Sequence, residues 1–177
     1  MIALLNLVDK PDELRKALET FFQGTLKAAL MGIGNPLRRD DAVGLRVLQG
    51  VRDRFGPSRS VVFIECETTP ENYVGVLREE QPSHILFIDA ADARLSAGTL
   101  FLANMDQIKG LSISTHAIPL NVYAEFIETL VEAKILLLGI QPEDVSFGEG
   151  LTAGVEQAAG RAAEFLSSIL TPLVCSR

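Results

Sequence analysis

Between residues 26 and 55 the chain reads LKAALMGIGNPLRRDDAVGLRVLQGVRDRF. Its first part, residues 26–33, is an apolar run of the kind that forms a buried β-strand. A turn rich in Gly, Asn and Pro follows, and valines then recur at every fourth position before a Gly-Pro pair. This spacing predicts an amphipathic helix that begins at Asp40 or Asp41 and ends at Phe55. A buried strand that leads into a helix is the repeating unit of an α/β protein.

The rest of the chain continues this alternation of strands and helices. Further apolar runs predict strands at residues 61–66, 84–90, 99–103 and 135–140, and amphipathic patterns predict helices at 11–23, 70–80, 119–133 and 151–170. Strands separated by helices run parallel, whereas the connection 90–98 is too short for a crossover helix, so the strand at 99–103 should return antiparallel as a hairpin on the strand at 84–90. We expect one domain over residues 1–177, with a helical extension at 1–25 and a tail at 171–177. Its fold should be a three-layer α/β/α sandwich around a mixed, mostly parallel, twisted sheet of five strands.

Composition and charge exclude several classes of protein. The 177 residues are 47% apolar and 22% charged, which is the balance of a globular domain. A net charge of -7 argues against binding to a phosphate backbone, so we expect no nucleic-acid partner. No uncharged apolar stretch approaches the roughly 20 residues that span a bilayer, and the N-terminus has no basic leader. The two cysteines, Cys66 and Cys175, form no CxxC motif, so we expect a cytoplasmic protein away from membranes.

Polar side chains with metal-binding chemistry follow three apolar segments. In an open α/β sheet, ligands bind beyond the carboxyl ends of the parallel strands. Asp41 lies after the first predicted strand, Asp89 ends the third, and His116 precedes the helix at 119–133. Two carboxylates and an imidazole can hold a divalent metal ion with open positions, so we expect these three side chains to converge on one rim. Each also has a structural alternative, because acids cap helices or bind loop amides and a lone histidine is more often structural.

Other polar residues are weaker candidates. One of the two acids Asp40 and Asp41 is expected only to cap the helix that follows. We expect Asp92 to lie in a loop or cap a helix, Glu65 to line a cleft wall, and His84 to lie at the surface or at a sheet edge. Gln141 is expected to have no chemical role. Arg38 and Arg39 should either balance the nearby acids or contact an acidic surface of a partner.

A nucleotide site is disfavoured. The pair Gly32-x-Gly34 begins a dinucleotide-binding fingerprint, but Leu37 occupies the position where that fingerprint has Gly or Ala. Two carboxylates at the entrance of the helix would also repel a bound phosphate. The chain contains no HExxH and no GxSxG motif, which removes the commoner signatures of zinc proteases and serine hydrolases.

Four ordered motifs carry a family resemblance. They are Gly32-Ile33-Gly34-Asn35 with Asp40-Asp41-Ala42-Val43-Gly44, then Ile88-Asp89-Ala90, then Thr115-His116 with Pro119-Leu120-Asn121, and finally Gly139-Ile140-Gln141-Pro142. Over residues 26–170 the chain resembles the hydrogenase maturation proteases, most closely the branch that processes the large subunit of hydrogenase 3-type nickel-iron hydrogenases. The resemblance implies an α/β endopeptidase that removes a C-terminal extension from the large-subunit precursor after nickel insertion. It also implies that Asp41, Asp89 and His116 contact nickel supplied by that precursor, with no permanently bound cofactor.

The sequence departs from the family at one place. Many relatives have Asp-Gly-Gly after the second strand, where this chain has Glu65-Cys66-Glu67. Because the sequence shows no covalent nucleophile, we expect direct hydrolysis of the peptide bond, with water activated by a carboxylate of Asp41 or Asp89 or by the metal. Two alternatives remain open: a maturation chaperone that binds the metal centre without cutting, and a nucleotide-binding regulator.

Overall fold

The computed structural model describes residues 11–56, 58–104, 107, 112–113 and 119–175. At its centre lies a sheet whose strands follow the order β2-β1-β3-β6-β4. These strands are β1 (Ala28–Ile33), β2 (Val61–Glu67), β3 (His84–Asp92), β4 (Leu100–Ala103) and β6 (Lys134–Ile140). Strand β1 pairs in parallel with β2 and β3, and β3 pairs in parallel with β6, whereas β4 is antiparallel to β6. The antiparallel direction of β4 is as predicted, but the expected hairpin with β3 is wrong, because β6 lies between β3 and β4. A two-residue strand that no sequence pattern predicts, β5 (Ser112–Ile113), pairs with the end of β3.

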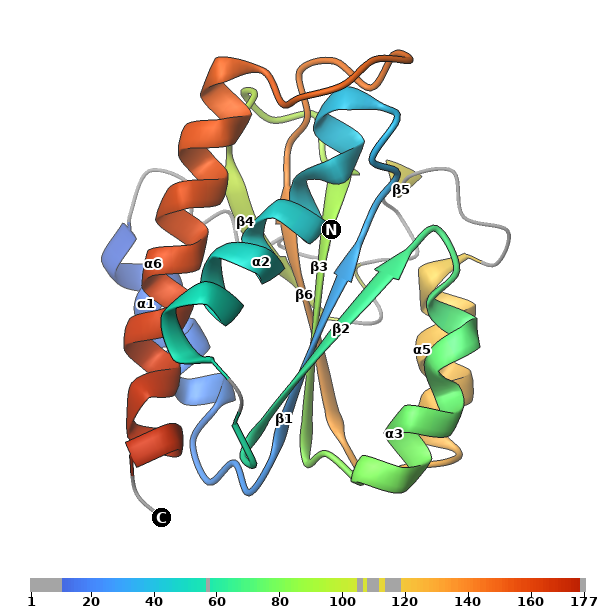
Figure 1. Ribbon diagram of the computed structural model, residues 1–177, viewed down its shortest axis with the longest axis vertical. Coiled ribbons are helices and arrows are strands. Elements are labelled where there is room, and N and C mark those ends of the chain that lie inside the picture. Colours follow the sequence, from blue (N-terminus) through green and yellow to red (C-terminus); the bar gives the residue numbers. More distant parts are fainter. Residues whose placement is uncertain (1–10, 57, 105–106, 108–111, 114–118, 176–177) are drawn as a thin grey trace.

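Helices cover both faces of the sheet, as Figure 1 shows. One face carries α1 (Pro11–Phe21), α2 (Val43–Phe55) and α6 (Ala153–Cys175), and the other carries α3 (Val74–Glu80) and α5 (Leu120–Glu128). Each face has its own apolar core. The predicted three-layer α/β/α sandwich with a mixed, mostly parallel sheet is therefore confirmed. Among the described helices, none has both the length and the apolar character needed to cross a membrane.

Burial of the central strands explains their sequences. All six residues of β1 and eight of the nine residues of β3 are buried, as expected for parallel strands covered on both faces. The start of α2 packs directly on the carboxyl ends of these two strands at Gly44. A Cβ atom at this position would lie only 2.1 Å from the carbonyl oxygen of Ile88 and 2.2 Å from that of Ile33. Glycine is therefore required for α2 to sit this close to the sheet.

Several helix boundaries differ from the prediction. The residues before α2 form a separate 3-10 turn, η1 (Arg39–Ala42), and another 3-10 turn, η2 (Pro70–Tyr73), precedes α3. Helix α5 ends at Glu128 rather than at residue 133, and α6 continues to Cys175, beyond the predicted end at residue 170. Ile169 and Leu170, at the predicted end of the helix, are buried in the core.

The expected surface or edge position of His84 is wrong. His84 begins the central strand β3 and is only 3% exposed. Its ring lies 5.2 Å from the ring of Phe21 and 6.3 Å from that of Phe22, measured between centroids. Both phenylalanines lie at the end of the N-terminal helical segment, which covers the amino end of β3. A distant part of the chain therefore buries a side chain whose local sequence suggests exposure.

Candidate functional site

The candidate site lies at the carboxyl end of the parallel strands. Three segments meet at this end: residues 34–42 after β1, the end of β3, and residues 141–152 after β6. Figure 1 shows the first and third of these loops together at the top of the molecule, above the sheet. This is the edge at which open α/β sheets bind their ligands.

Asp41 is held in place by the turn that follows β1. Its side chain is 1% exposed, and its Oδ2 atom accepts a hydrogen bond of 3.1 Å from the amide of Asn35. A Cβ atom at Gly34 would lie 1.9 Å from the backbone oxygen of Asp41, so only glycine permits this close turn. Within the described part of the chain, no group donates a hydrogen bond to Oδ1 of Asp41. A buried carboxylate oxygen without a donor is costly unless a ligand completes it, which marks Asp41 as a functional candidate.

The neighbouring acid, Asp40, has a different role. Its carboxylate accepts hydrogen bonds of 2.9 Å from the amides of Glu143 and Asp144, and bonds of 2.7 Å and 3.0 Å from the amide and hydroxyl of Thr152. Asp40 thus joins the turn after β1 to the loop after β6. In the described chain no side-chain hydrogen bond caps the start of η1 or of α2. The expectation that one of the two acids caps the helix is therefore wrong, because the acceptor capacity of Asp40 is used by a loop about 100 residues away.

Asp89 reaches the same edge from the middle of the sheet. It is fully buried near the end of β3, where it lies opposite Gly139 of β6. The carbonyl of Ile88, its preceding residue, is in close contact with Gly44, which follows Asp41 by three positions. The structure therefore brings Asp41 and Asp89 to one end of the sheet, as predicted. His116, the third predicted ligand, lies outside the described residues.

The described residues alone do not form a complete metal site. Among them, no group of three or more His, Cys, Asp or Glu side chains is close enough to hold a metal ion. Two carboxylates at one edge supply only part of the predicted ligand set. The convergence of all three residues, Asp41, Asp89 and His116, therefore stays a prediction.

Glu65-Cys66-Glu67 separates into exposed acids and a buried thiol. Glu65 forms an ion pair with Arg52 and lines a pocket of about 350 Å³ together with Pro36 and Ala42, so it lies in a cleft wall beside η1. The thiol of Cys66 is buried. Burial raises its pKa, and the negative charges of Asp89 and Glu71 raise it further. Cys66 is thus held as a neutral thiol, which is a poor nucleophile.

Two further polar side chains, those of Gln141 and Asp92, bind the backbone that follows β3. Gln141 is buried, and its Oε1 accepts hydrogen bonds of 2.9 Å and 3.1 Å from the amides of Ala93 and Leu95. Its Nε2 donates to Asp92, which also accepts from the amide of Arg94. These two hydrogen bonds, the backbone one first, lower the pKa of Asp92. The expected loop or cap position of Asp92 is wrong, because Asp92 is the last residue of β3 and pairs with Ser112 of β5.

The two arginines of the turn bind the loop after β6. Arg38 Nε donates to the carbonyl of Val145 at 3.0 Å, and Arg39 Nε lies 3.2 Å from Oδ2 of Asp144. Hydrogen bonds from the amide and then the hydroxyl of Ser146 lower the pKa of Asp144, which keeps it ionised for this pair. Local charge balance, one of the two roles expected for Arg39, is therefore seen in the structure.

The backbone amides of the turn are not available to a phosphate. The amide of Gly34 donates to the carbonyl of Glu67 at 2.9 Å, that of Asn35 to Asp41, and that of Leu37 to the side chain of Asn35 at 3.0 Å. A dinucleotide site needs such amides free to point at the pyrophosphate. The geometry of this turn therefore argues against the nucleotide-binding alternative.

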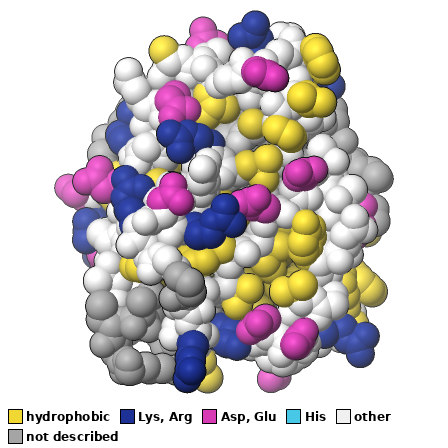
Figure 2. All heavy atoms as spheres, viewed as in Figure 1, with side chains coloured by type: hydrophobic (Ala, Val, Ile, Leu, Met, Phe, Trp, Pro, Cys, Tyr) yellow, Lys and Arg dark blue, Asp and Glu magenta, His cyan; other side chains and the backbone are white. Residues whose placement is uncertain are grey.

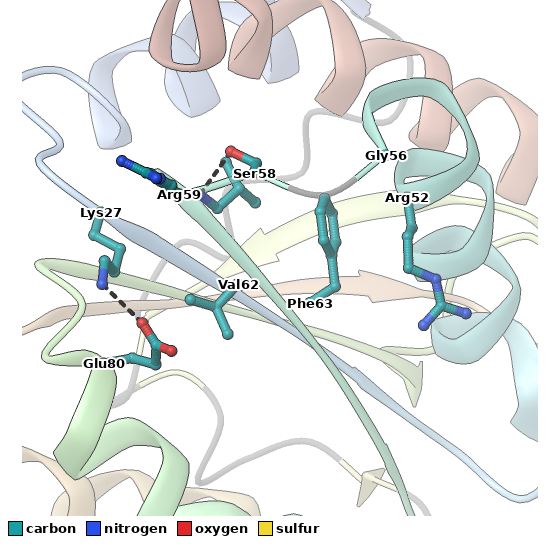
Figure 3. Close-up of a pocket in the computed structure, with 9 residues that line it drawn as sticks. Lys27, Arg52, Gly56, Ser58, Arg59, Val62, Phe63 and Glu80 are labelled. Atoms are coloured by element: carbon teal, nitrogen blue, oxygen red, sulfur yellow. Dashed lines mark hydrogen bonds and ion pairs between the residues drawn. The ribbon is translucent and has the colours of Figure 1, made fainter. Parts of the chain in front are cut away.

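A second pocket lies far from these residues. It has a volume of about 670 Å³ and is lined at the amino end of β1 and β2 by side chains that include Lys27, Arg59 and Phe63 (Figure 3). Lys27 is already paired with Glu80, at 2.7 Å between Nζ and Oε2. Neither Asp41 nor Asp89 lines this pocket. It is therefore not the candidate site.

Comparisons with known proteins agree on one family. The family model described as hydrogenase maturation protease matches residues 45–169, which include Asp89 and begin just after Asp41. The Escherichia coli K12 hydrogenase 3 maturation protease is 29% identical over 130 residues, covering 73% of this chain and 81% of the relative. A Methanocaldococcus jannaschii protein assigned to the same family is 35% identical over 127 residues, covering 68% of this chain and 75% of the relative.

A solved structure extends the agreement to the fold. The crystal structure of a nickel-iron hydrogenase maturation protease from Thermococcus kodakarensis KOD1 superposes with a TM-score of 0.80 at 30% identity. The match covers 88% of this chain and 99% of that protein. Together with the mixed sheet and the acidic residues at its carboxyl edge, these findings show that this chain is a peptidase of the hydrogenase maturation protease family.

Proposed function

We propose that this protein removes the C-terminal extension of the large-subunit precursor of a nickel-iron hydrogenase, and that it recognises the nickel ion that the precursor already carries. The observation that carries the proposal is the carboxylate of Asp41, which is buried at the site edge with its Oδ1 atom lacking a donor among the described residues. A cation brought by the substrate would complete this acceptor. The family membership supplies the class of substrate.

In this proposal, recognition acts as a checkpoint on metal insertion. Asp41, Asp89 and His116 contact the nickel of the precursor, so a precursor without nickel lacks the ion that completes binding. A ligand shifts a binding equilibrium only through interactions that differ between the two states, and the nickel supplies that difference. Cleavage therefore waits for nickel, which belongs to the substrate rather than to this protein.

The proposed reaction is direct hydrolysis of the peptide bond. A carboxylate of Asp41 or Asp89, or the nickel, activates the attacking water, and positive charge near the carbonyl stabilises the oxyanion. The neutral, buried state of Cys66 supports this route over a thiolate nucleophile. A free buried thiol also supports a cytoplasmic setting, where cysteines stay reduced.

The test incubates the purified protein with its cognate precursor, with and without nickel, and measures the C-terminal mass of the precursor. The proposal predicts shortening only of the nickel-loaded form, and its loss in each of the variants Asp41→Ala, Asp89→Ala and His116→Ala. Exposed Asp53, on α2, provides the matched control Asp53→Ala. If a folded variant of the three trims the loaded precursor at the normal rate, the proposed site is wrong. Binding without any shortening would instead identify a maturation chaperone.

A further inference from the structure

Three large apolar side chains are exposed beside the candidate site. Leu37 is 50%, Val145 is 37% and Phe147 is 81% exposed. Leu37 belongs to the turn after β1, and the other two belong to the loop after β6. Figure 2 shows hydrophobic side chains gathered at the upper right of this face, in the region of these loops. We call Leu37, Val145 and Phe147 the apolar rim.

The backbone beneath the apolar rim is ordered by hydrogen bonds between its two segments. The amide of Gly148 donates to the carbonyl of Leu37, and the amide of Arg39 donates to the carbonyl of Gly148, each at 2.9 Å. Arg39 adopts a φ of 43°, a conformation that a non-glycine residue rarely holds unless its surroundings impose it. Arg38 adds its bond to the carbonyl of Val145. The exposed side chains are thus carried on a scaffold that is fixed before any partner arrives.

Fixed exposure of an aromatic side chain is unfavourable in water and useful in binding. Solvent-exposed apolar clusters commonly mark protein interaction sites, and aromatic residues dominate the energy of such sites. A pre-ordered loop also reduces the conformational entropy lost on association. Charged groups flank the rim, with the Arg39–Asp144 pair on one side and Glu149 following Gly148. An apolar centre with a charged border is the usual anatomy of a protein–protein interface.

The position of the rim identifies the partner. Asp40 holds the loop after β6 through its bonds to Glu143, Asp144 and Thr152, and Asp41 is the next residue. A protein that places a metal ion against Asp41 must therefore lie over these two segments. In the proposed function, the protein that supplies the ion therefore also covers the apolar rim.

We propose that the apolar rim docks on an apolar patch of the folded hydrogenase large-subunit precursor beside its nickel centre, with Phe147 as the main anchor. This inference rests on the proposed function and adds a contact that does not depend on nickel. The rim therefore contributes to the affinity for the precursor before metallation, whereas Asp41 contributes only after it.

The test measures binding and cleavage with Phe147→Asp and Phe147→Ala. Phe126→Ala is the matched control, because Phe126 is 51% exposed on α5, on another part of the surface. For the nickel-free precursor, we expect Phe147→Asp to weaken the dissociation constant at least about tenfold, as loss of an interface anchor does. Phe126→Ala should leave that constant within about twofold. For the loaded precursor, Phe147→Asp should raise KM by a similar factor with little change in kcat.

Other outcomes separate this inference from the proposed function. If the wild-type protein fails to shorten the precursor, yet Phe147→Asp weakens binding, the docking role of the rim is supported and the proposed cleavage reaction is wrong. If the wild-type protein cleaves the precursor and neither Phe147 variant changes the dissociation constant or KM, the proposed docking role of the apolar rim is wrong. Sedimentation of the free protein tests whether a second copy of this chain binds the rim instead. A dimer that Phe147→Asp dissociates would identify the rim as a self-association surface and overturn the proposal. Should Phe147→Asp fold poorly, the pair Phe147→Ala and Val145→Ala gives the same comparison.

Discussion

The two ends of the sheet bury polar side chains for different purposes. At the amino end, His84 lies under Phe21 and Phe22, and its Nδ1 atom is 3.0 Å from the hydroxyl of Ser83. At the carboxyl end, Asp40 accepts four hydrogen bonds, whereas the Oδ1 atom of Asp41 lacks a donor in the described structure. Burial alone therefore does not identify a functional residue. Nor does an unpartnered buried atom alone, because Nε2 of His84 and Oε2 of Glu71 also lack a partner among the described residues. What distinguishes Asp41 is an open acceptor at the carboxyl end of the parallel strands, where α/β sheets bind ligands.

The difference between Asp40 and Asp41 predicts that one acid serves stability and the other serves activity. A buried charge that is fully hydrogen-bonded stabilises the fold, and its removal leaves donors unsatisfied. A buried charge that is only partly satisfied destabilises the fold and persists where function needs it. The four substitutions below test this division, in order of expected effect.

Asp41→Asn should have the largest effect, and only on activity. We expect cleavage of the loaded precursor to fall about a thousandfold, because an amide neither binds a metal cation as a carboxylate does nor accepts a proton from water. The free energy of unfolding should stay constant or rise, since an incompletely paired buried charge is removed. Mass spectrometry of the precursor and urea unfolding measure the two effects. A large loss of stability would place Asp41 with Asp40 as a structural residue.

Asp40→Ala should destabilise the protein. Three backbone amides and one hydroxyl lose their acceptor, so we expect the free energy of unfolding to fall by about 3 kcal/mol. Hydrogen exchange should accelerate most at residues 143–152, where the donors lie. Asp53→Ala, at an exposed position of α2, should change stability by less than about 0.5 kcal/mol. Unchanged exchange in the loop would show that water replaces Asp40 without loss.

Phe22→Ala should affect stability without affecting the chemical step. Phe22 directly follows α1 and is buried in the core, so its truncation should cost about 3 kcal/mol of unfolding free energy. The turnover number should stay within about twofold at a temperature where the variant is folded. Leu26→Ala, at a side chain 68% exposed, is the control with little expected effect. A turnover number that falls with stability would couple the two ends of the sheet.

His84→Phe should have the smallest effect, visible only in the pH dependence of stability. Burial lowers the pKa of His84 below its ordinary value of 6.5, and the nearby charge of Lys134 lowers it further, against an opposing contribution from the carbonyl of Phe21. Below pH 6.5 the unfolded histidine binds a proton that the folded one does not, so stability falls as the pH falls.

Phenylalanine keeps an aromatic ring at this position but binds no proton. Urea unfolding between pH 7 and pH 5 should therefore show a flatter dependence for His84→Phe than for the wild-type protein. Asp92 and Asp144 also have lowered pKa values, but their contribution is lost only in more acidic solution, near and below the ordinary aspartate value of 3.8. An identical slope in both proteins would contradict the assignment to His84.

The sequence predicted the sheet well because its strands are encoded locally. Apolar runs between turn residues mark β1, β3 and β6, and the short connection before β4 requires an antiparallel strand. The placement of Asp41 and Asp89 at one edge followed from the same logic, since Asp41 lies in the turn after β1 and Asp89 lies near the end of β3. Helix ends were less well predicted. The η1 turn depends on contacts of Asp40 with the loop after β6, which the local pattern does not contain.

Roles of individual polar residues depended on partners far along the chain. Asp40 and Asp41 are the same residue type in adjacent positions, and only the loop after β6 distinguishes them. His84 precedes an apolar run like any surface residue at the start of a strand, until the N-terminal segment covers it. Phe147 stands in the sequence Ser-Phe-Gly-Glu-Gly, whose glycines suggest a loop and whose exposed aromatic ring is the signal of an interface.

By itself, the sequence determined the α/β class, the order of the strands and helices, the family, and the edge of the sheet at which Asp41 and Asp89 lie. Periodicity and turn residues act over a few positions, so these properties can be derived locally. Only the tertiary structure decided which carboxylate is saturated and which remains open, and which apolar side chains stay in solvent. Hydrogen bonds and burial are settled by segments up to about 110 residues apart, and no local pattern records which of them will meet.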